Sequence, residues 1–262
     1  MKYKKIMLFF SVALLLSLVL RFIQLQYAVD SLTGFYKAEF LSLGSYITLI
    51  ILAFAAMAAI FSFTSHRSPD HPPKLNIPLS FCSVIFAISI ITEMLLEGFP
   101  QNSILWQAIL LKISGILLVA FLTVFALKRF VAISIPSVCY SLFAIYLMFK
   151  LISCFSAVSN LALISDNILL IGAYCSSLVF AVCFAKLYNG MDAEKGFKKL
   201  MASGLVSVVF CFTQSVPHII YNLLNGNSYL HTPLRTSFGV FFLGVFIFSF
   251  LLSHFSKENA CE

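Results

Sequence analysis

The residues of this chain that could do chemistry are polar side chains inside long apolar stretches. In the clearest series the members recur every three or four residues: Ser203, Ser207, Cys211, Gln214, His218 and Asn222. This spacing places them on one face of a helix. Pro217 frees the backbone carbonyl near Thr213, so a kink beside Gln214 and His218 is expected. Gln214, His218 and Asn222 are therefore candidate binding residues. The alternative for His218 is a single bond to a backbone carbonyl.

Charged side chains inside apolar stretches form a second group. Glu93 shares a helical face with Ser89 and Glu97. Lys112 follows about eight residues after the start of the next stretch, which is a depth of roughly 12 Å. Charges inside a bilayer face the bundle interior or a water-filled cavity, so we expect Glu93 and Lys112 to share a cavity or to pair. Two structural alternatives are a Lys112 ammonium that reaches the surface along its stem, and a pair that only joins helices.

Two arginines complete the candidate site. Arg21 and Gln24 lie at the end of the first apolar stretch, and Arg235 precedes the last one. Together with Lys112, these arginines could hold an anionic group, while Glu93 serves as a counter-charge or a proton carrier. The predicted ligand-binding residues are Arg21, Gln24, Glu93, Lys112, Gln214, His218, Asn222 and Arg235.

The sequence points to no catalytic residue, metal site or cofactor. It contains no G-x-S-x-G, H-E-x-x-H or P-loop motif. The seven cysteines include no C-x-x-C pair, and six of them lie within or beside apolar runs, as small packing residues do. The net charge of +7 is spread over helix ends, so we expect no nucleic-acid partner. A membrane-embedded enzyme stays open as a third class.

The elements that must position these residues are membrane-spanning helices. Hydrophobic residues make up 61% of the chain, charged residues 10%, and the mean hydropathy is +1.00. A helix needs about 20 apolar residues to cross a bilayer core. The expected spans are Ile6–Leu25, Phe40–Phe63, Ile77–Leu96, Ile104–Leu127, Ala132–Ile152, Asn167–Tyr188, Leu200–Tyr221 and Thr236–Phe255.

The distribution of basic residues predicts the orientation. With the N-terminus in the cytoplasm, twelve of the 17 Lys and Arg residues fall on the cytoplasmic side. The five on the outer side are Arg21, Lys37, Lys112, Lys150 and Arg235. This asymmetry agrees with the positive-inside rule. Eight spans also return the C-terminus to the cytoplasm.

A weak internal repeat is a further possibility. Leu95-Leu96-Glu97-Gly98 resembles Leu223-Leu224-Asn225-Gly226, and Arg21 and Lys150 lie near the ends of the first and fifth spans. The two halves would be residues 1–130 and 131–262. Chance matches are common in apolar sequences, so the predicted organisation is one integral membrane domain over 1–262, with the repeat as a possibility within it.

One short segment has a family resemblance. Arg21 is followed by Asp30, Thr33, Gly34, Phe35 and Tyr36 in an Asp-x-x-Thr-Gly-Phe-Tyr run. This arrangement resembles uncharacterised bacterial multi-pass membrane proteins. The resemblance covers about 20 residues, and it implies a bacterial origin but no activity.

The sequence therefore predicts an all-α polytopic transmembrane helix bundle of about eight helices. An arrangement of these helices as two four-helix halves is a possibility. Its expected place is a bacterial inner membrane, with the lipid bilayer as partner. The predicted role is to bind or transport a small polar or anionic solute through an outward-facing polar pocket. The alternative is a sensory or regulatory membrane subunit in which the polar cluster is purely structural.

Overall fold

Eight α-helices form the chain in a computed structural model, which describes residues 2–30, 35–65, 76–96, 105–131, 133–158, 165–191, 193–224 and 233–258. The helices are α1 (Lys2–Ile23), α2 (Leu41–Ser65), α3 (Ile77–Leu96), α4 (Leu105–Leu127), α5 (Leu142–Val158), α6 (Ser165–Tyr188), α7 (Ala193–Leu224) and α8 (Leu234–Glu258). Eight segments of the described chain are long and apolar enough to span a membrane. In such helices every interior backbone group is bonded internally, as a bilayer core requires. The predicted all-α multi-pass membrane fold is confirmed.

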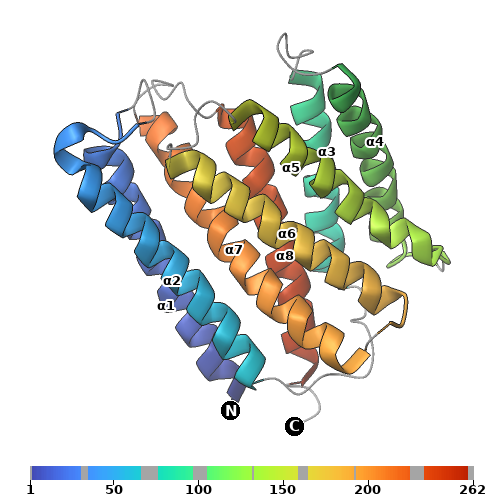
Figure 1. Ribbon diagram of the computed structural model, residues 1–262. Coiled ribbons are helices and arrows are strands. Elements are labelled where there is room, and N and C mark those ends of the chain that lie inside the picture. Colours follow the sequence, from blue (N-terminus) through green and yellow to red (C-terminus); the bar gives the residue numbers. More distant parts are fainter. Residues whose placement is uncertain are drawn as a thin grey trace.

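Consecutive helices run up and down through the bundle (Figure 1). We call the end where α1 begins and α8 ends the terminal end, and the opposite end, where α1 ends, the far end. The longest helix, α7, packs against α1, α2, α6 and α8. Of the membrane-spanning window of α7, 78% is buried, against 28–50% for the other seven spans. Polar residues on α7 are therefore enclosed by other helices.

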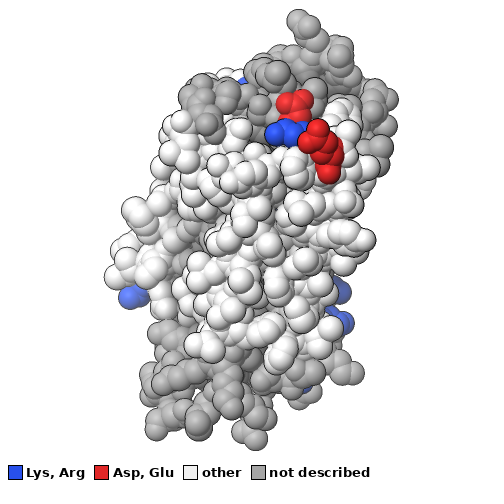
Figure 2. Space-filling view, turned by 90° about the vertical axis from the view of Figure 1, so that its left-hand side faces the viewer, with Lys and Arg blue, Asp and Glu red and all other residues white. Residues whose placement is uncertain are grey.

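The outer surface of the bundle is apolar. Leu8, Leu15 and Val19 of α1 and Tyr46 and Leu49 of α2 are all more than half exposed. Most of the face shown in Figure 2 carries neither acidic nor basic side chains; the acidic atoms lie near its upper end, and basic atoms lie there and at its left and right edges lower down. A continuous apolar surface of this extent is unusual on a water-soluble protein and suits contact with lipid.

Every predicted span corresponds to a helix, and the largest differences fall at helix boundaries. After Ile23, α1 gives way to a π-helix, η1 (Gln24–Ala28). The fifth span does not begin at Ala132: extended Pro136 precedes a 3-10 helix, η3 (Ser137–Ser141), and α5 follows. Proline disfavours the α conformation in the residue before it, which delays this start. α7 begins seven residues before the predicted Leu200, because its charged first turns are helical without being apolar.

Aromatic rings fix the terminal end of the bundle. The rings of Tyr140 in η3 and Tyr188 in α6 stack with their centroids 4.4 Å apart. Phe125 of α4 and Phe143 of α5 each pack edge-on against Phe184 of α6. Buried aromatic pairs of this geometry add to the hydrophobic packing. They hold α4, α5 and α6 together at this end. The polar clusters lie toward the far end.

Candidate functional site

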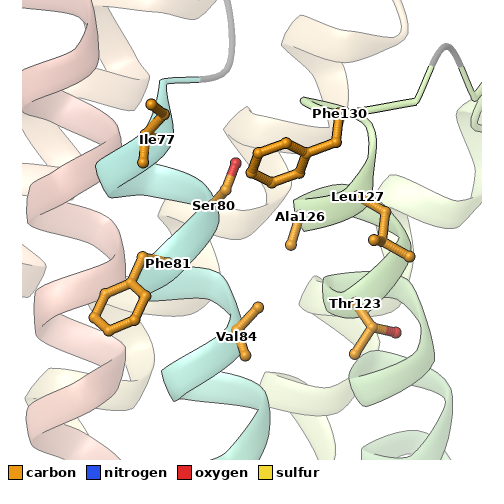
Figure 3. A pocket seen from close by; sticks show the side chains of 8 residues that line it. All are labelled: Ile77, Ser80, Phe81, Val84, Thr123, Ala126, Leu127 and Phe130. Carbon is orange, nitrogen blue, oxygen red and sulfur yellow. The ribbon is translucent and has the colours of Figure 1, made fainter.

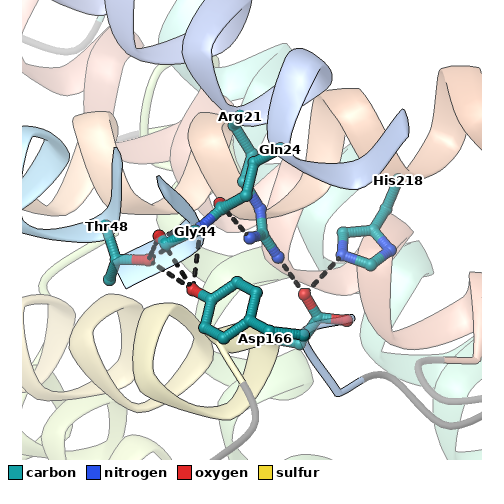
Figure 4. A network of polar contacts seen from close by, with 7 residues as sticks. Arg21, Gln24, Gly44, Thr48, Asp166 and His218 are labelled. Carbon is teal, nitrogen blue, oxygen red and sulfur yellow. Dashed lines mark hydrogen bonds and ion pairs between the residues drawn. The ribbon is translucent and has the colours of Figure 1, made fainter. Parts of the chain in front are cut away.

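A buried charge cluster joins three helices near the far end. Arg21 Nη2, in the last turn of α1, is bonded to Asp166 Oδ1 in the first turn of α6. His218 Nε2 of α7 lies 3.2 Å from the same carboxylate oxygen. The three side chains are at most 1% exposed, and Figure 4 shows Asp166 between the other two. Charges this deeply buried are tolerated only when they are paired.

The helix ends themselves favour this pairing. Asp166 lies at the start of α6, where an acidic side chain complements the positive end of the helix dipole. Arg21 lies at the end of α1, where a basic side chain complements the negative end. The end of α1 meets the start of α6 because the two helices run in opposite directions. The charges that suit the two helix dipoles therefore also attract each other across the contact between the helices.

Gln24 extends the cluster from α1 to α2. Its Oε1 accepts a hydrogen bond from Arg21 Nη1. Its Nε2 lies 2.7 Å from the Gly44 carbonyl oxygen and 2.9 Å from Thr48 Oγ1. The Tyr36 hydroxyl is 2.8 Å from both Gln24 Nε2 and Thr48 Oγ1. Gln24 opens the π-helix η1, and π-helical turns are rare elements that often occur at functional sites.

Gly44 allows the tyrosine to reach this network. A Cβ atom at Gly44 would lie 2.3 Å from Tyr36 Cε1, well inside van der Waals contact. The Tyr36 ring therefore packs directly on the backbone of α2, and its hydroxyl lies 3.1 Å from the Gly44 carbonyl oxygen. Phe35 and Tyr36 of the run that resembles bacterial membrane proteins are described, whereas Thr33 and Gly34 lie outside the described residues. Tyr36 thus belongs to the cluster that Arg21 begins.

The polar face predicted on α7 is real and turns toward α6 in the middle of the bundle. Ser207 hydrogen-bonds Ser177 of α6. Cys211 Sγ lies 3.8 Å from both hydroxyl oxygens. Ser207, Cys211 and Ser177 are fully buried. This part of the face is closed by hydrogen bonds between the two helices.

Gln214 lies on the same face, one turn beyond Cys211 and one turn before His218. Its side chain is buried, with 1% exposed. Neither Nε2 nor Oε1 of its amide has a hydrogen-bond partner among the described residues. An unpaired buried amide costs about 1–3 kcal/mol, judged from the effects of mutations in proteins. Gln214 is therefore a buried polar group whose amide is unpaired among the described residues.

A second ion pair joins α3 to α5. Lys150 Nζ lies 2.8 Å from Glu93 Oε1, and both side chains are at most 10% exposed. Gly239 of α8 faces the same carboxylate, since a Cβ atom there would lie 3.1 Å from Glu93 Oε2. A cavity of about 10 Å³ adjoins Glu93 and is also lined by Tyr146 and Tyr174. That volume is about what one water molecule requires.

The eight predicted site residues fall into separate groups. Arg21, Gln24 and His218 belong to the first cluster, Gln214 lies one turn from it, and Asn222 Nδ2 donates to the His218 carbonyl oxygen at 3.0 Å. Glu93 belongs to the second pair. Arg235 joins α8 to α3 by donating to the Leu96 carbonyl oxygen at 2.8 Å. Lys112 is half-buried on α4, and its sharing of a cavity with Glu93 stays a prediction.

Four partners of these residues were not predicted: Tyr36, Thr48, Lys150 and Asp166. A signal existed for Asp166, because it is the only acidic residue between Glu97 and Asp192. The predicted span began at Asn167 and so left Asp166 in a loop, although an acidic residue is typical of a helix start. Lys150 lies near the end of the fifth predicted span, but the sequence does not identify its partner.

No family model, no curated protein and no solved structure matches this chain. Among the residues that the structure describes, no group of three or more His, Cys, Asp or Glu side chains is arranged to hold a metal ion.

Proposed function

We propose that the chain binds a small polar solute in the far half of the bundle, between α1, α6 and α7, and moves it across the membrane or reports its presence. The observation that carries the proposal is the buried amide of Gln214, whose donor and acceptor groups both lack a partner among the described residues. His218, the member of the Arg21–Asp166–His218 cluster that α7 supplies, lies one helical turn away on the same face. A solute with both a hydrogen-bond donor and an acceptor could bond to the Gln214 amide and also reach the charge cluster.

The charge balance of the cluster bears on the class of solute. Arg21 is already bonded to the Asp166 carboxylate, so an anion at Arg21 would have to compete with Asp166. A neutral solute avoids this competition because it brings no anionic group to Arg21, and a zwitterion offsets it because its cationic group can pair with Asp166 while its anionic group pairs with Arg21. We therefore favour a solute without net charge over an anionic one, which the sequence by itself had suggested on the basis of three cations.

The second candidate function is a sensory or regulatory subunit that transports nothing. It is favoured by the closure of the first cluster, in which Asp166 and Gln24 are both bonded to Arg21 and are buried. In that role the charges only lock α1, α2, α6 and α7 together. The two candidates differ in whether Gln214 ever receives a partner.

A ligand screen on the protein purified in detergent would test the proposal. We expect a neutral or zwitterionic solute to raise the thermal unfolding temperature of the wild type. The variant Gln214→Leu should lose that shift, because it has no amide for the solute. Without ligand, Gln214→Leu should unfold at a higher temperature than the wild type, by an amount equivalent to about 1 kcal/mol, since the unpaired amide is removed.

Gln107→Leu is the matched control, because it removes the same amide from a half-buried position on α4. It should keep the ligand shift. A solute-induced shift that survives Gln214→Leu would disprove the proposed site. A screen across neutral, zwitterionic, anionic and cationic solutes that yields no shift at all would favour the regulatory subunit.

We also propose that the protein lies in a bacterial cell membrane with both termini in the cytoplasm. The support is the bias of twelve basic residues to five between the two sides, together with an even number of spans. The candidate solute site then lies in the outer half of the membrane. A solute would reach it from outside the cell.

A further inference from the structure

An apolar groove between α3 and α4 lies at the terminal end, far from the polar clusters. Its volume is about 430 Å³. The side chains that line it are Ile77, Ser80, Phe81, Val84, Thr123, Ala126, Leu127 and Phe130. In Figure 3, Ser80 and Val84 of α3 and Ala126 and Phe130 on the opposite side lie toward the gap between the two helices. The side chains that line the groove expose almost only carbon atoms. A molecule that binds in it must therefore be apolar over most of its length.

The dimensions of the groove suit a lipid chain. On the α3 side the lining runs from Ile77 to Val84, which is about 10 Å at 1.5 Å per residue. Opposite it, the lining runs from Thr123 to Leu127 at the end of α4 and includes Phe130 in the turn that follows. One leaflet of the hydrocarbon core is about 15 Å thick, half of the full core. Ile77 and Phe81, which lie on the other side, are both more than 60% exposed. The groove is thus open to the bilayer over much of a single leaflet.

One polar group in the groove has no partner. The Ser80 hydroxyl oxygen is buried and lacks a hydrogen-bond partner among the described residues, and Figure 3 shows it directed into the space between α3 and α4. The Thr123 hydroxyl, by contrast, is bonded to the Ala120 carbonyl oxygen at 2.8 Å. A lipid ester oxygen would give Ser80 the acceptor that it lacks. Ser80 lies one turn from the start of α3, near the depth at which a bilayer changes from chains to headgroups.

Two adjacent cations lie at the mouth of the groove. Lys128 and Arg129 stand between two lining residues, Leu127 and Phe130, in the turn that ends α4. Arg129 is exposed and Lys128 is half-buried, with its Nζ 3.3 Å from the Tyr140 hydroxyl. Neighbouring basic side chains at the membrane surface attract anionic headgroups. From this combination we infer that the groove binds one anionic phospholipid, its acyl chain along α3 and α4, its ester at Ser80 and its phosphate at Lys128 and Arg129.

Lipid retention would test this inference. The protein is reconstituted in nanodiscs with equal amounts of phosphatidylglycerol and phosphatidylcholine, so that both leaflets are alike, and bound lipids are counted by native mass spectrometry. We expect the wild type to retain one phosphatidylglycerol in preference. Each cation contributes about fivefold at a membrane surface, so Lys128→Gln with Arg129→Gln should remove most of the preference. Lys198→Gln with Lys199→Gln, an adjacent pair on α7, should preserve it.

A second variant tests the groove itself. Thr123→Trp places a large ring in the groove from an exposed position on α4, and it should abolish retention of the anionic lipid. Ile116→Trp, at a position that is 61% exposed on the same helix and outside the groove lining, should leave retention unchanged. Equal retention of both lipids by the wild type would overturn the inference. So would loss of preference in the Lys198 and Lys199 control, or a dimer that fills the groove with a second copy.

Discussion

At the scale of single residues, two buried ion pairs connect segments that are far apart in the chain. Arg21 and Asp166 are separated by 145 residues, and Lys150 and Glu93 by 57. In a bilayer an isolated charge is costly, so each partner depends on the other. Removing both charges often costs little, whereas removing one leaves an uncompensated charge. Comparing single and double variants can therefore separate the contribution of each pair to stability from the contribution of each residue.

The Glu93 pair gives a direct prediction. Lys150→Met should lower the free energy of unfolding by about 3 kcal/mol, because Glu93 then stays buried without its partner. Adding Glu93→Leu should recover most of this loss. The measurement is chemical unfolding in detergent micelles, compared across the wild type, both single variants and the double variant.

Lys112→Met supplies the control, since it changes the same residue type on α4, where Lys112 is half-buried. We expect a smaller loss there than for Lys150→Met. If Lys112→Met were the more damaging change and Glu93→Leu rescued it, then Lys112 would be the energetic partner of Glu93, and the sequence-based pairing would hold.

At the scale of elements, glycines decide how closely helices and connections approach. Gly44 in the first turn of α2 faces the Tyr36 ring, which leaves no room for a Cβ atom. Gly172 in α6 faces Phe210 of α7, but a Cβ there would sit 3.5 Å from the ring, which is ordinary contact. A glycine is therefore required by the packing at position 44, whereas position 172 has room for a larger residue.

Replacing these glycines by alanine should shift stability in opposite directions. Gly44→Ala should lower the free energy of unfolding by about 1 kcal/mol or more, because Tyr36 must leave Gly44 and Thr48 and lose its hydrogen bonds. Gly172→Ala should raise it by up to about 1 kcal/mol, because alanine favours a helix interior more than glycine. Thermal unfolding of both variants would show the two signs.

Tyr36→Phe tests the cause of the Gly44 effect. If Gly44→Ala acts through the tyrosine, its cost should not add fully to that of Tyr36→Phe, because both changes remove the same bonds. Simple additivity of the two costs would show that Gly44 matters for another reason, such as its position in the first turn of α2.

At the scale of the whole molecule, the bundle surrounds α7 and gathers its buried charges near one end. The Arg21–Asp166 and Lys150–Glu93 pairs lie toward the far end, while the aromatic cluster and the apolar groove lie toward the terminal end. With the terminal end in the cytoplasm, the proposed solute site and the proposed lipid site would lie in opposite leaflets.

The orientation can be checked with reporter fusions in bacterial cells. Fusions at Asn76 and Glu262 should report a cytoplasmic location, and a fusion at Asn227 should report an external one. The reason is the excess of lysine and arginine on the terminal side. An external reading at Glu262 would contradict the proposed topology, and with it the placement of the solute site in the outer half.

Much of the fold was predictable from the sequence. Apolar length alone marks a membrane helix, so all eight spans were found, and the polar face of α7 followed from its spacing. The boundaries of η1, η3 and the start of α7 were not, because apolar length does not show where a span leaves the α conformation or how far a helix extends beyond its apolar part. The repeat stays a prediction, since Gly98 and Gly226 lie outside the described residues.

Which charges meet was decided only by the tertiary structure. The sequence determined that Arg21, Glu93 and Lys150 lie in or beside membrane helices, and burial without a partner would be too costly for each. It could not determine that Arg21 meets Asp166 or that Glu93 meets Lys150, because helices of similar depth offer several partners at the same level of the membrane. The choice depends on how the helices pack side by side. That packing, together with the unpaired amide of Gln214, is a property of the assembled bundle.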